Sequence, residues 1–201
     1  MAKGKGFEWE ICRALSYNWT QGTINDDVFC PTDSSGGRAT KRRKKGKKTE
    51  YKSADIGLAH PIGELLIKHW SMEAKSGYVK KRKTKIGVTK DQWSILDFLD
   101  SKQEKPIFEE FWDQCLNDAD ITQREPILFF RRNNRKACTA IYKSLFNRLN
   151  NFFGKPKMQY LIFSSEFGDI IIMNFNEFLE WCHDLKSFIE YLEKGNGKEK
   201  I

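Results

Sequence analysis

Two charged residues separated by one alanine, Glu73 and Lys75, lie near the end of "LLIKHWSMEAKSG" (residues 65–77), a stretch that predicts a β-strand. Side chains alternate between the two faces of a strand, so both charges are expected on one face, opposite Trp70 and Met72. A solvated strand face with a weak ion pair would explain this pattern. The alternative is a site in which the carboxylate and the ammonium group act together on a bound molecule.

A second carboxylate, Asp55, lies in the segment "ADIGLA", where Ile56 and Leu58 are expected on the other face of a short strand. The following "HPIGE" predicts a turn because it contains Pro and Gly. Residues 54–75 are therefore expected to form a β-hairpin that places Asp55 beside Glu73. Like charges on adjacent strands are destabilising. A divalent cation such as Mg²⁺, which binds one or two carboxylates together with water and phosphate oxygens, would remove that repulsion.

A third carboxylate, Glu8, is expected on the apolar face of an N-terminal helix. The apolar face of "GFEWEICRALSYNW" (residues 6–19) is centred between Ile11 and Leu15 at about 100° per residue, and Glu8 falls inside it. Glu10 falls well outside that face, among residues on the solvent side. A carboxylate on a buried face has to be paired or bound to a metal. Glu8 is therefore a candidate for the same site, and Glu10 is not.

The order of these motifs, "KGKGFEWEI", then "SADIG", then "MEAK", resembles the PD-(D/E)xK nuclease superfamily, most of all its branch of Holliday-junction resolvases and related phage-type endonucleases. The resemblance covers roughly residues 3–78 and departs from the pattern at Ala54, where the superfamily's name has Pro. It implies an α/β (α+β) fold with a mixed central β-sheet flanked by helices, a restriction-endonuclease-like core. It also implies Mg²⁺-dependent hydrolysis of DNA, with Mn²⁺ as a substitute, in the cytoplasm of a bacterium or a phage-infected host.

The same resemblance implies roles for particular residues. Asp55, Glu73 and the Ala74 carbonyl oxygen would bind the metal, with Glu8 completing the set or bridging to it through water. Lys75 would orient the attacking water, so the predicted catalytic residues are Glu8, Asp55, Glu73 and Lys75. Cleavage is expected to be structure-selective, of the Holliday-junction type, and to leave 5′-phosphate and 3′-hydroxyl ends. Junction resolution needs two active sites, so a homodimer would favour it.

Positive charge is concentrated in three windows of a 201-residue chain whose net charge is +8. Residues 38–52, 75–90 and 131–136 hold 20 of the 35 basic residues and one of the 27 acidic residues, so the rest of the chain carries −11. Such windows are the electrostatic footprint expected for a phosphate-rich partner such as DNA. Read alone, the "KRRKKGKK" run would also fit a solvated loop or a nuclear localisation tract. The residues predicted to bind DNA are Arg38, Lys41, Arg42, Arg43, Lys44, Lys45, Lys47, Lys48, Lys80, Lys81, Arg82, Lys83 and Lys85.

Several other classes of protein are disfavoured by the sequence. Its five cysteines are scattered without a CxxC pair, which argues against a zinc ribbon or finger and suits a reducing cytoplasm. The "GKKT" at residues 46–49 has Lys41 in the place of the first glycine of a P-loop, so no nucleotide cofactor is expected. No stretch approaches the ~20 apolar residues of a membrane span, and no membrane partner is expected.

The remaining segments predict the elements around the site. A helix is expected over residues 89–102, with Trp93, Leu96 and Leu99 inward and Gln92 on its surface. Further helices are expected over 107–119, 143–153 and 176–193, and strands at Val28–Cys30, "EPILFFRR", "KACTAIY", "YLIFSS" and "DIIIMNF".

The final helix carries an apolar stripe that is expected to face the core, with a dimer seam as the alternative. Its members are Phe178, Cys182, Leu185, Ile189 and Leu192.

These elements are expected to form a single nuclease domain over residues 1–201. Its parts are a catalytic core at about 3–103 with a basic insert at 38–52, distal strands and helices at 104–193, and a disordered tail at 194–201.

A non-catalytic nucleic-acid-binding protein that relies on its basic segments is the rival hypothesis. Asp55 and Glu73 argue against it, because acids in a phosphate-facing site without a metal would weaken binding. Nicking of a supercoiled plasmid with Mg²⁺ and with EDTA discriminates between the two hypotheses.

Overall fold

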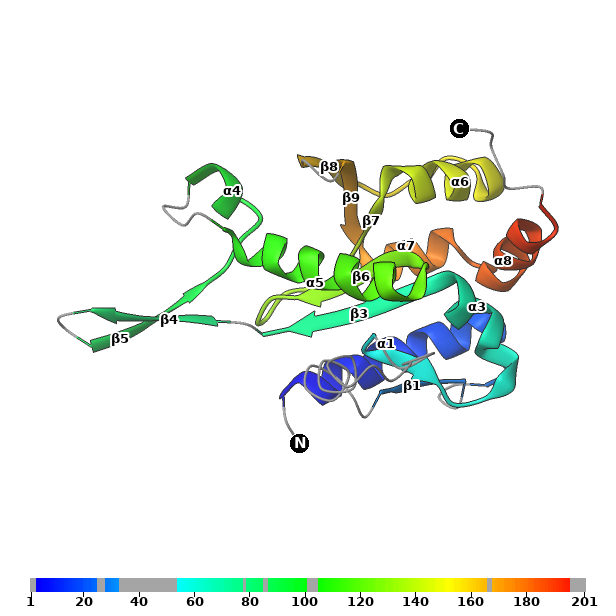
Figure 1. Ribbon diagram of the computed structural model, residues 1–201, viewed down its shortest axis with the longest axis horizontal. Helices are drawn as coiled ribbons and strands as arrows, with labels where there is room; N and C mark the ends of the chain where they lie inside the picture. Colours follow the sequence, from blue (N-terminus) through cyan, green and yellow to red (C-terminus); the bar gives the residue numbers. More distant parts are fainter. Residues whose placement is uncertain are drawn as a thin grey trace.

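The centre of the structure, a computed structural model, is a five-stranded sheet (Figure 1). In spatial order its strands are β3 (Trp70–Ser76), β6 (Glu125–Arg131), β7 (Cys138–Tyr142), β9 (Gly168–Asn174) and β8 (Tyr160–Ser165). β3 and β6 run parallel, whereas the other neighbouring pairs in this sheet are antiparallel. The predicted mixed sheet is therefore confirmed.

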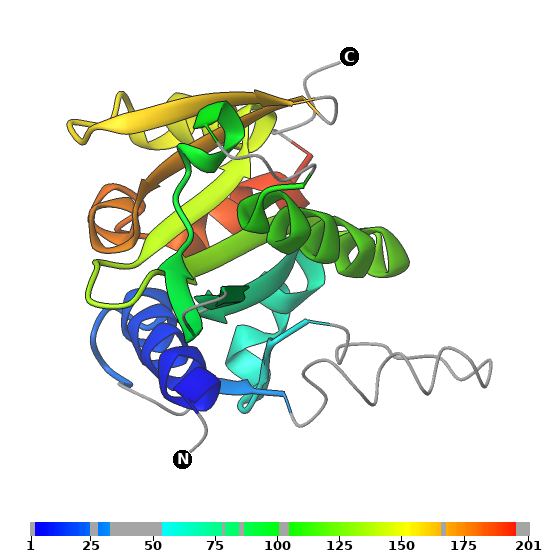
Figure 2. The ribbon, with the colours of Figure 1, turned by 90° about the vertical axis from the view of Figure 1, so that its left-hand side faces the viewer.

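Helices cover both faces of this sheet. They include α1 (Lys3–Trp19), α5 (Ile107–Thr122), α6 (Lys143–Phe153), α7 (Phe175–Trp181) and α8 (Leu185–Glu193). Alternation along β6 explains how one strand serves two cores. Ile127 and Phe129 pack in the core that contains residues of α1, α7 and α8, whereas Leu128 and Phe130 pack in the core that contains residues of α5. Figure 2 shows α1 and α5 on opposite sides of β3. The helix-flanked, restriction-endonuclease-like arrangement is as expected.

The structure describes residues 3–24, 28–32, 54–77, 79–84, 87–100, 105–165 and 168–195. The basic insert predicted at residues 38–52 lies outside these ranges, as does the predicted tail apart from Lys194 and Gly195. Across the described ranges, no helix has the length and the apolar character that a membrane crossing requires.

The β-hairpin predicted over residues 54–75 is wrong. β2 (Ile56–Leu58) pairs antiparallel with β1 (Phe29–Pro31), and the chain then passes through a 3₁₀ turn, η1 (Pro61–Gly63), into helix α3 (Glu64–His69) before β3 begins. A short apolar run cannot by itself be assigned to a strand or a helix. Here α3 buries Leu66 and Ile67 against the core, and the parallel partner of β3 lies far along the chain.

The helix predicted over residues 89–102 is also largely wrong. A strand, β5 (Gly87–Gln92), pairs with β4 (Val79–Thr84) in a separate two-stranded sheet, and helix α4 covers Asp97–Asp100 alone. Trp93 is buried as expected, with 3% of its surface exposed. Leu96 and Leu99 are 56% and 86% exposed, so they do not face the core. Because β5 ends at Gln92 and α4 begins only at Asp97, the continuous helix that would have turned both leucines inward does not form.

The distal elements follow the sequence expectation except at the last helix, which is divided into α7 and α8. The Asp184 side chain begins α8 by accepting a hydrogen bond from the Ser187 backbone N–H at 3.0 Å. Phe178, Cys182 and Leu185 are fully buried, so the apolar stripe faces the core as predicted. A dimer seam would need these side chains at the surface.

Candidate active site

Asp55 reaches β3 from the end of β2, although no hairpin connects them. Thr32, just after β1, fixes this segment because its backbone N–H donates to the Asp55 carbonyl oxygen at 2.9 Å and its hydroxyl donates to the Ala54 carbonyl oxygen at 2.7 Å. β3 is an edge strand of the five-stranded sheet. One backbone N–H of β3, that of Ala74, donates to Oδ2 of Asp55 at 3.1 Å. The carboxylate is thereby held against the outer edge of the strand.

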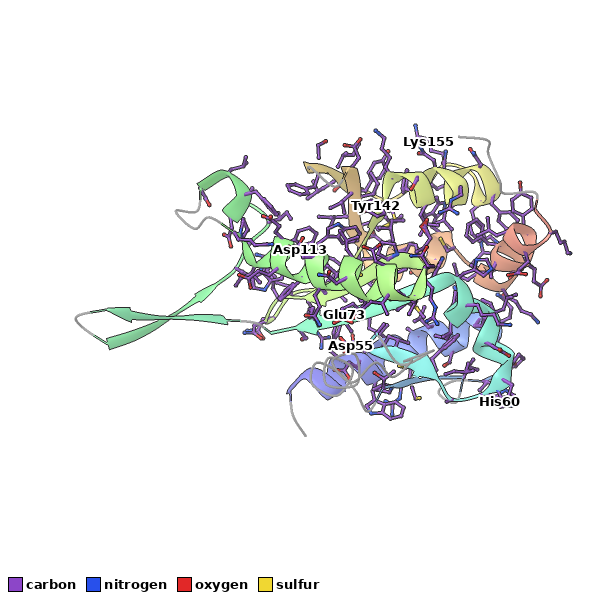
Figure 3. All side chains as sticks on the ribbon, viewed as in Figure 1. Asp55, His60, Glu73, Asp113, Tyr142 and Lys155 are labelled. Carbon is purple, nitrogen blue, oxygen red and sulfur yellow. The ribbon has the colours of Figure 1, made fainter. Side chains whose placement is uncertain are left out.

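Glu73 and Lys75 share a face of β3, as the alternation predicted. The Lys75 ammonium group contacts Oε1 of Glu73 directly and lies 3.5 Å from Oδ2 of Asp55. The side chains of Asp55, Glu73 and Lys75 are 6%, 2% and 7% exposed. A solvated strand face with a weak ion pair is therefore ruled out. Figure 3 shows Asp55 and Glu73 next to each other beside β3.

The site holds two buried carboxylates and one ammonium group, and the pKa of Glu73 is raised to about 8. Loss of hydration on burial is the largest cause, and the negative charge of Asp55 adds to it. Lys75 acts in the opposite direction through its charge and its hydrogen bond. Without a further cation, the site therefore favours a proton on Glu73 at neutral pH.

A glutamine that was not predicted from the sequence, Gln114 of α5, completes the surroundings of Glu73. Its side-chain Nε2 donates to Oε1 of Glu73 at 2.8 Å, so this oxygen receives both Lys75 and Gln114. Asp118 lies one helical turn further along α5, and its charge also raises the pKa of Glu73. The helical periodicity of α5 gave no signal for Gln114, because it lies outside the buried apolar face formed by Phe108, Trp112 and Cys115. Gln92, which was expected on a helix surface, lies in β5.

Glu8 and Glu10 lie on α1 as the helical periodicity predicted. Glu8 is buried at 6% exposure, and its charge contributes to a raised pKa of the Cys12 thiol, which is due first to burial. The Glu10 side chain is half exposed and accepts a hydrogen bond from Arg131 at 2.7 Å. Residues of α1 share a core with Met72, on the face of β3 opposite Glu73. A ligand set common to Glu8 and Glu73 would thus have to form around the outer edge of β3.

The donors fit a hard divalent cation. Carboxylate and carbonyl oxygens suit Mg²⁺ and Mn²⁺, and Mg²⁺ needs few protein ligands because water and phosphate oxygens supply the rest. Within the described residues, no three His, Cys, Asp or Glu side chains gather closely enough to hold a metal ion. The assignment of Glu8, Asp55, Glu73 and the Ala74 carbonyl as metal ligands stays a prediction.

The residues predicted to bind DNA fall into two groups. Four of them, Lys80, Lys81, Arg82 and Lys83, lie on β4, in the two-stranded ribbon that leaves the body of the molecule (Figure 1). The others lie outside the described residues: Arg38, Lys41, Arg42, Arg43, Lys44, Lys45, Lys47, Lys48 and Lys85.

Comparison with known proteins identifies a family. The model of a family described as "Phage putative PDDEXK endonuclease" matches residues 1–187. No curated protein and no solved structure matches the chain significantly.

Proposed function

The chain belongs to this family of phage PDDEXK endonucleases, whose model spans residues 1–187 of its 201, and we propose accordingly that it is a Mg²⁺-dependent DNA endonuclease. The main support for the proposal is that Asp55, Glu73 and Lys75 lie together. They are buried, and Lys75 contacts or lies close to both carboxylates. Their order in the sequence is the one that D…E-x-K nucleases require, and the Ala74 N–H between Glu73 and Lys75 donates to Asp55. Such a cluster is costly to fold unless it serves a bound ion.

Asp55, Glu73 and the Ala74 carbonyl oxygen would hold the metal, with Glu8 contributing directly or through water. Mg²⁺ in this position supplies Lewis-acid stabilisation of the charge that develops on the phosphate, and Mn²⁺ would substitute for it. The raised pKa of Glu73 supports the proposal, because a divalent cation would offset the repulsion from Asp55 that contributes to it.

The protein's own groups would fix the geometry of the reaction. Lys75 donates toward both carboxylates, and we expect it to hold the attacking water near the phosphate. Gln114 donates to Oε1 of Glu73 from α5, which leaves the carboxylate in one orientation. The Ala74 N–H does the same for Asp55. Attack in line with the leaving 3′ oxygen would give 5′-phosphate and 3′-hydroxyl ends.

The finer proposal is structure-selective cleavage of the Holliday-junction type, in a bacterial or phage-infected cytoplasm. The basic windows would bind the DNA backbone, and a homodimer would supply the two active sites that junction resolution needs. Cleavage of a four-way junction, a flap and a linear duplex compared on one gel tests this choice. Preference for the linear duplex would contradict it and leave the endonuclease proposal intact.

Plasmid nicking tests the endonuclease proposal itself. We expect nicked circles from supercoiled plasmid with Mg²⁺ or Mn²⁺, none with EDTA, and none from Asp55→Asn. A matched control is Asp169→Asn, since Asp169 pairs with Lys143 at the surface, and this variant should nick like wild type. If the wild-type protein and both variants bind the plasmid but none of them nicks it, the result would favour the non-catalytic nucleic-acid-binding protein.

A further inference from the structure

The five-stranded sheet has a second edge, which is formed by β8 and lies opposite β3 (Figure 1). β8 pairs with β9 and with no other strand in the part of the chain that the structure describes. The outer side of an edge strand presents backbone N–H and C=O groups that can pair with another strand. At the β3 edge, Asp55 takes up the N–H of Ala74. The β8 edge is therefore the one to which a further strand can be added.

The sequence of β8 is unusual for an edge strand. Proteins commonly protect a sheet edge with charged residues or proline, and "YLIFSS" contains neither. Leu161 and Ile162 are 55% and 56% exposed, and Tyr160 is 38% exposed. Alternation along the strand places Leu161 on one face of the sheet and the other two on the opposite face. Apolar surface thus borders the edge on both faces.

Helix α4 and the residue before it extend this apolar surface. The ring of Phe98 in α4 lies 4.1 Å from that of Phe163 in β8, centroid to centroid, so α4 packs against the strand. Ten large hydrophobic residues are exposed within the described ranges, and five of them belong to β8 or to residues 96–100. Single exposed apolar residues are normal on a protein surface, whereas a cluster of them marks an interaction site.

The charges around β8 favour a second copy of the chain as the partner. In a twofold dimer the same surface patch meets itself, so a charged patch would face its own charge. β8 has no charged residue. Asp169, which stands opposite Ser164 in β9, already accepts hydrogen bonds from Ser164 and from Lys143, each at 2.7 Å. The edge is therefore apolar and self-complementary.

From these observations we propose that two copies of the chain pair antiparallel through β8, which joins their sheets into one sheet of ten strands. Residues that stand opposite each other in an antiparallel pair share a face. The register that opposes apolar side chains places Ile162 opposite Ile162 of the second copy, and Leu161 opposite Phe163 of the second copy. Such a pair closes after two copies and covers both exposed edges. This inference rests on the proposed function and adds to it the surface through which the homodimer forms.

The proposed dimer keeps the two candidate active sites apart. β8 and β3 are separated by four strand spacings of about 4.8 Å, which is about 19 Å. In the ten-stranded sheet the two β3 strands are the outermost, nine spacings or about 43 Å apart. Each copy then holds its own Asp55, Glu73 and Lys75 away from the interface. A monomeric variant should accordingly still nick plasmid, but it should lose the two coordinated cuts that junction resolution needs.

Sedimentation velocity of the full-length protein over a range of micromolar concentrations tests the dimer. We expect wild type to have twice the mass of one chain, which is 23.6 kDa. Ile162→Lys should weaken dimerisation about 100-fold or more, because it places two like charges together on the twofold axis. Ile62→Lys is the matched control, since Ile62 lies in η1 and is 42% exposed, and this variant should remain a dimer.

A cross-linking variant, Ile162→Cys, tests the register without disturbing the interface. Opposed Cα atoms in an antiparallel pair are about 4.5 to 5.5 Å apart, within the range that a disulfide spans. With oxidised glutathione, we expect a disulfide-linked dimer of Ile162→Cys well above the level seen with wild type or with Ile62→Cys. Equal cross-linking in the three proteins, a monomeric wild type, or a dimer unaffected by Ile162→Lys would overturn the inference.

Plasmid nicking and four-way junction cleavage with Mg²⁺ are measured on the same preparations. If wild type nicks plasmid but is a monomer, the interface inference fails alone. If wild type dimerises through β8 but never cuts DNA, the endonuclease proposal fails and the interface stands.

Discussion

The carboxylate cluster and the β4–β5 ribbon differ in their charged residues and in how the fold holds them. Asp55, Glu73 and Lys75 are nearly buried. Asp55 accepts a hydrogen bond from the edge of β3, Glu73 accepts one from α5, and Lys75 donates to both carboxylates. The ribbon forms a two-stranded sheet of its own and pairs with no other strand in the described part of the chain. Hydrolysis at a phosphate needs catalytic groups positioned to within a fraction of an ångström. Binding to the DNA backbone needs positive charge that extends along the phosphates.

This difference implies that cutting and binding are separable. Changes in the cluster should abolish cleavage and spare DNA binding. Changes in the ribbon should weaken binding, while cleavage at saturating protein persists.

Asp55→Asn should have the largest effect, a loss of cleavage on the order of 10³-fold or more, because it would remove a negative charge from the proposed metal site. DNA binding should be kept or tightened, since a negative charge beside phosphate is removed. Single-turnover cleavage and anisotropy titrations in EDTA measure the two quantities. Asp169→Asn is the control for a carboxylate that pairs at the surface. Loss of binding in parallel with cleavage would show that the two functions are not separable.

Substitution of the two glutamates of "FEWE", Glu8 and Glu10, should affect cleavage very differently. Glu8→Gln is expected to reduce cleavage on the order of 10²-fold or more if Glu8 places the metal or its water, with little loss of thermal stability in the absence of metal. Glu10→Gln should change stability by no more than about 0.5 kcal/mol, since Glu10 pairs with Arg131 at the surface. An inactive Glu10→Gln with an active Glu8→Gln would reverse the assignment.

Gln114→Ala should reduce kcat/KM about 10-fold, because Glu73 loses one of the two donors to Oε1 and is oriented less well. Gln114→Glu should be worse, since a further carboxylate would oppose ionisation of Glu73. Asn117→Ala is the matched control, because the Asn117 side chain donates to a carbonyl oxygen of its own helix. Equal effects from the two alanine variants would remove Gln114 from the site.

Stability of the metal-free protein should fall as pH rises from about 4.5 to about 8, the ordinary and the folded pKa of Glu73. In this window the folded state keeps a proton on Glu73 that the unfolded state has released, so raising the pH favours unfolding by up to about 1.4 kcal/mol per pH unit. Glu73→Gln should flatten this dependence. Denaturant melts at several pH values check the result, and an identical slope in the variant would contradict it.

The sequence predicted the local patterns of the site well and its connections poorly. The inward face of α1 and the shared face of Glu73 and Lys75 follow from periodicity, which needs no knowledge of the partner element. The pairing of β1 with β2 and of β3 with β6 joins segments that are distant in the chain, so an apolar run such as residues 65–69 could be read as strand or helix. Gln114 was missed for the same reason.

Calorimetric titration of Mn²⁺ into the protein without DNA, at pH 7 in buffers of different ionisation enthalpy, tests whether the Asp55–Glu73 pair is a metal centre. We expect saturable binding by wild type with release of up to one proton, because the cation displaces the proton held by Glu73. Asp55→Asn should bind at least about 10-fold more weakly. Equal affinity in the two proteins, or no saturable binding by wild type, would contradict a metal centre at this pair.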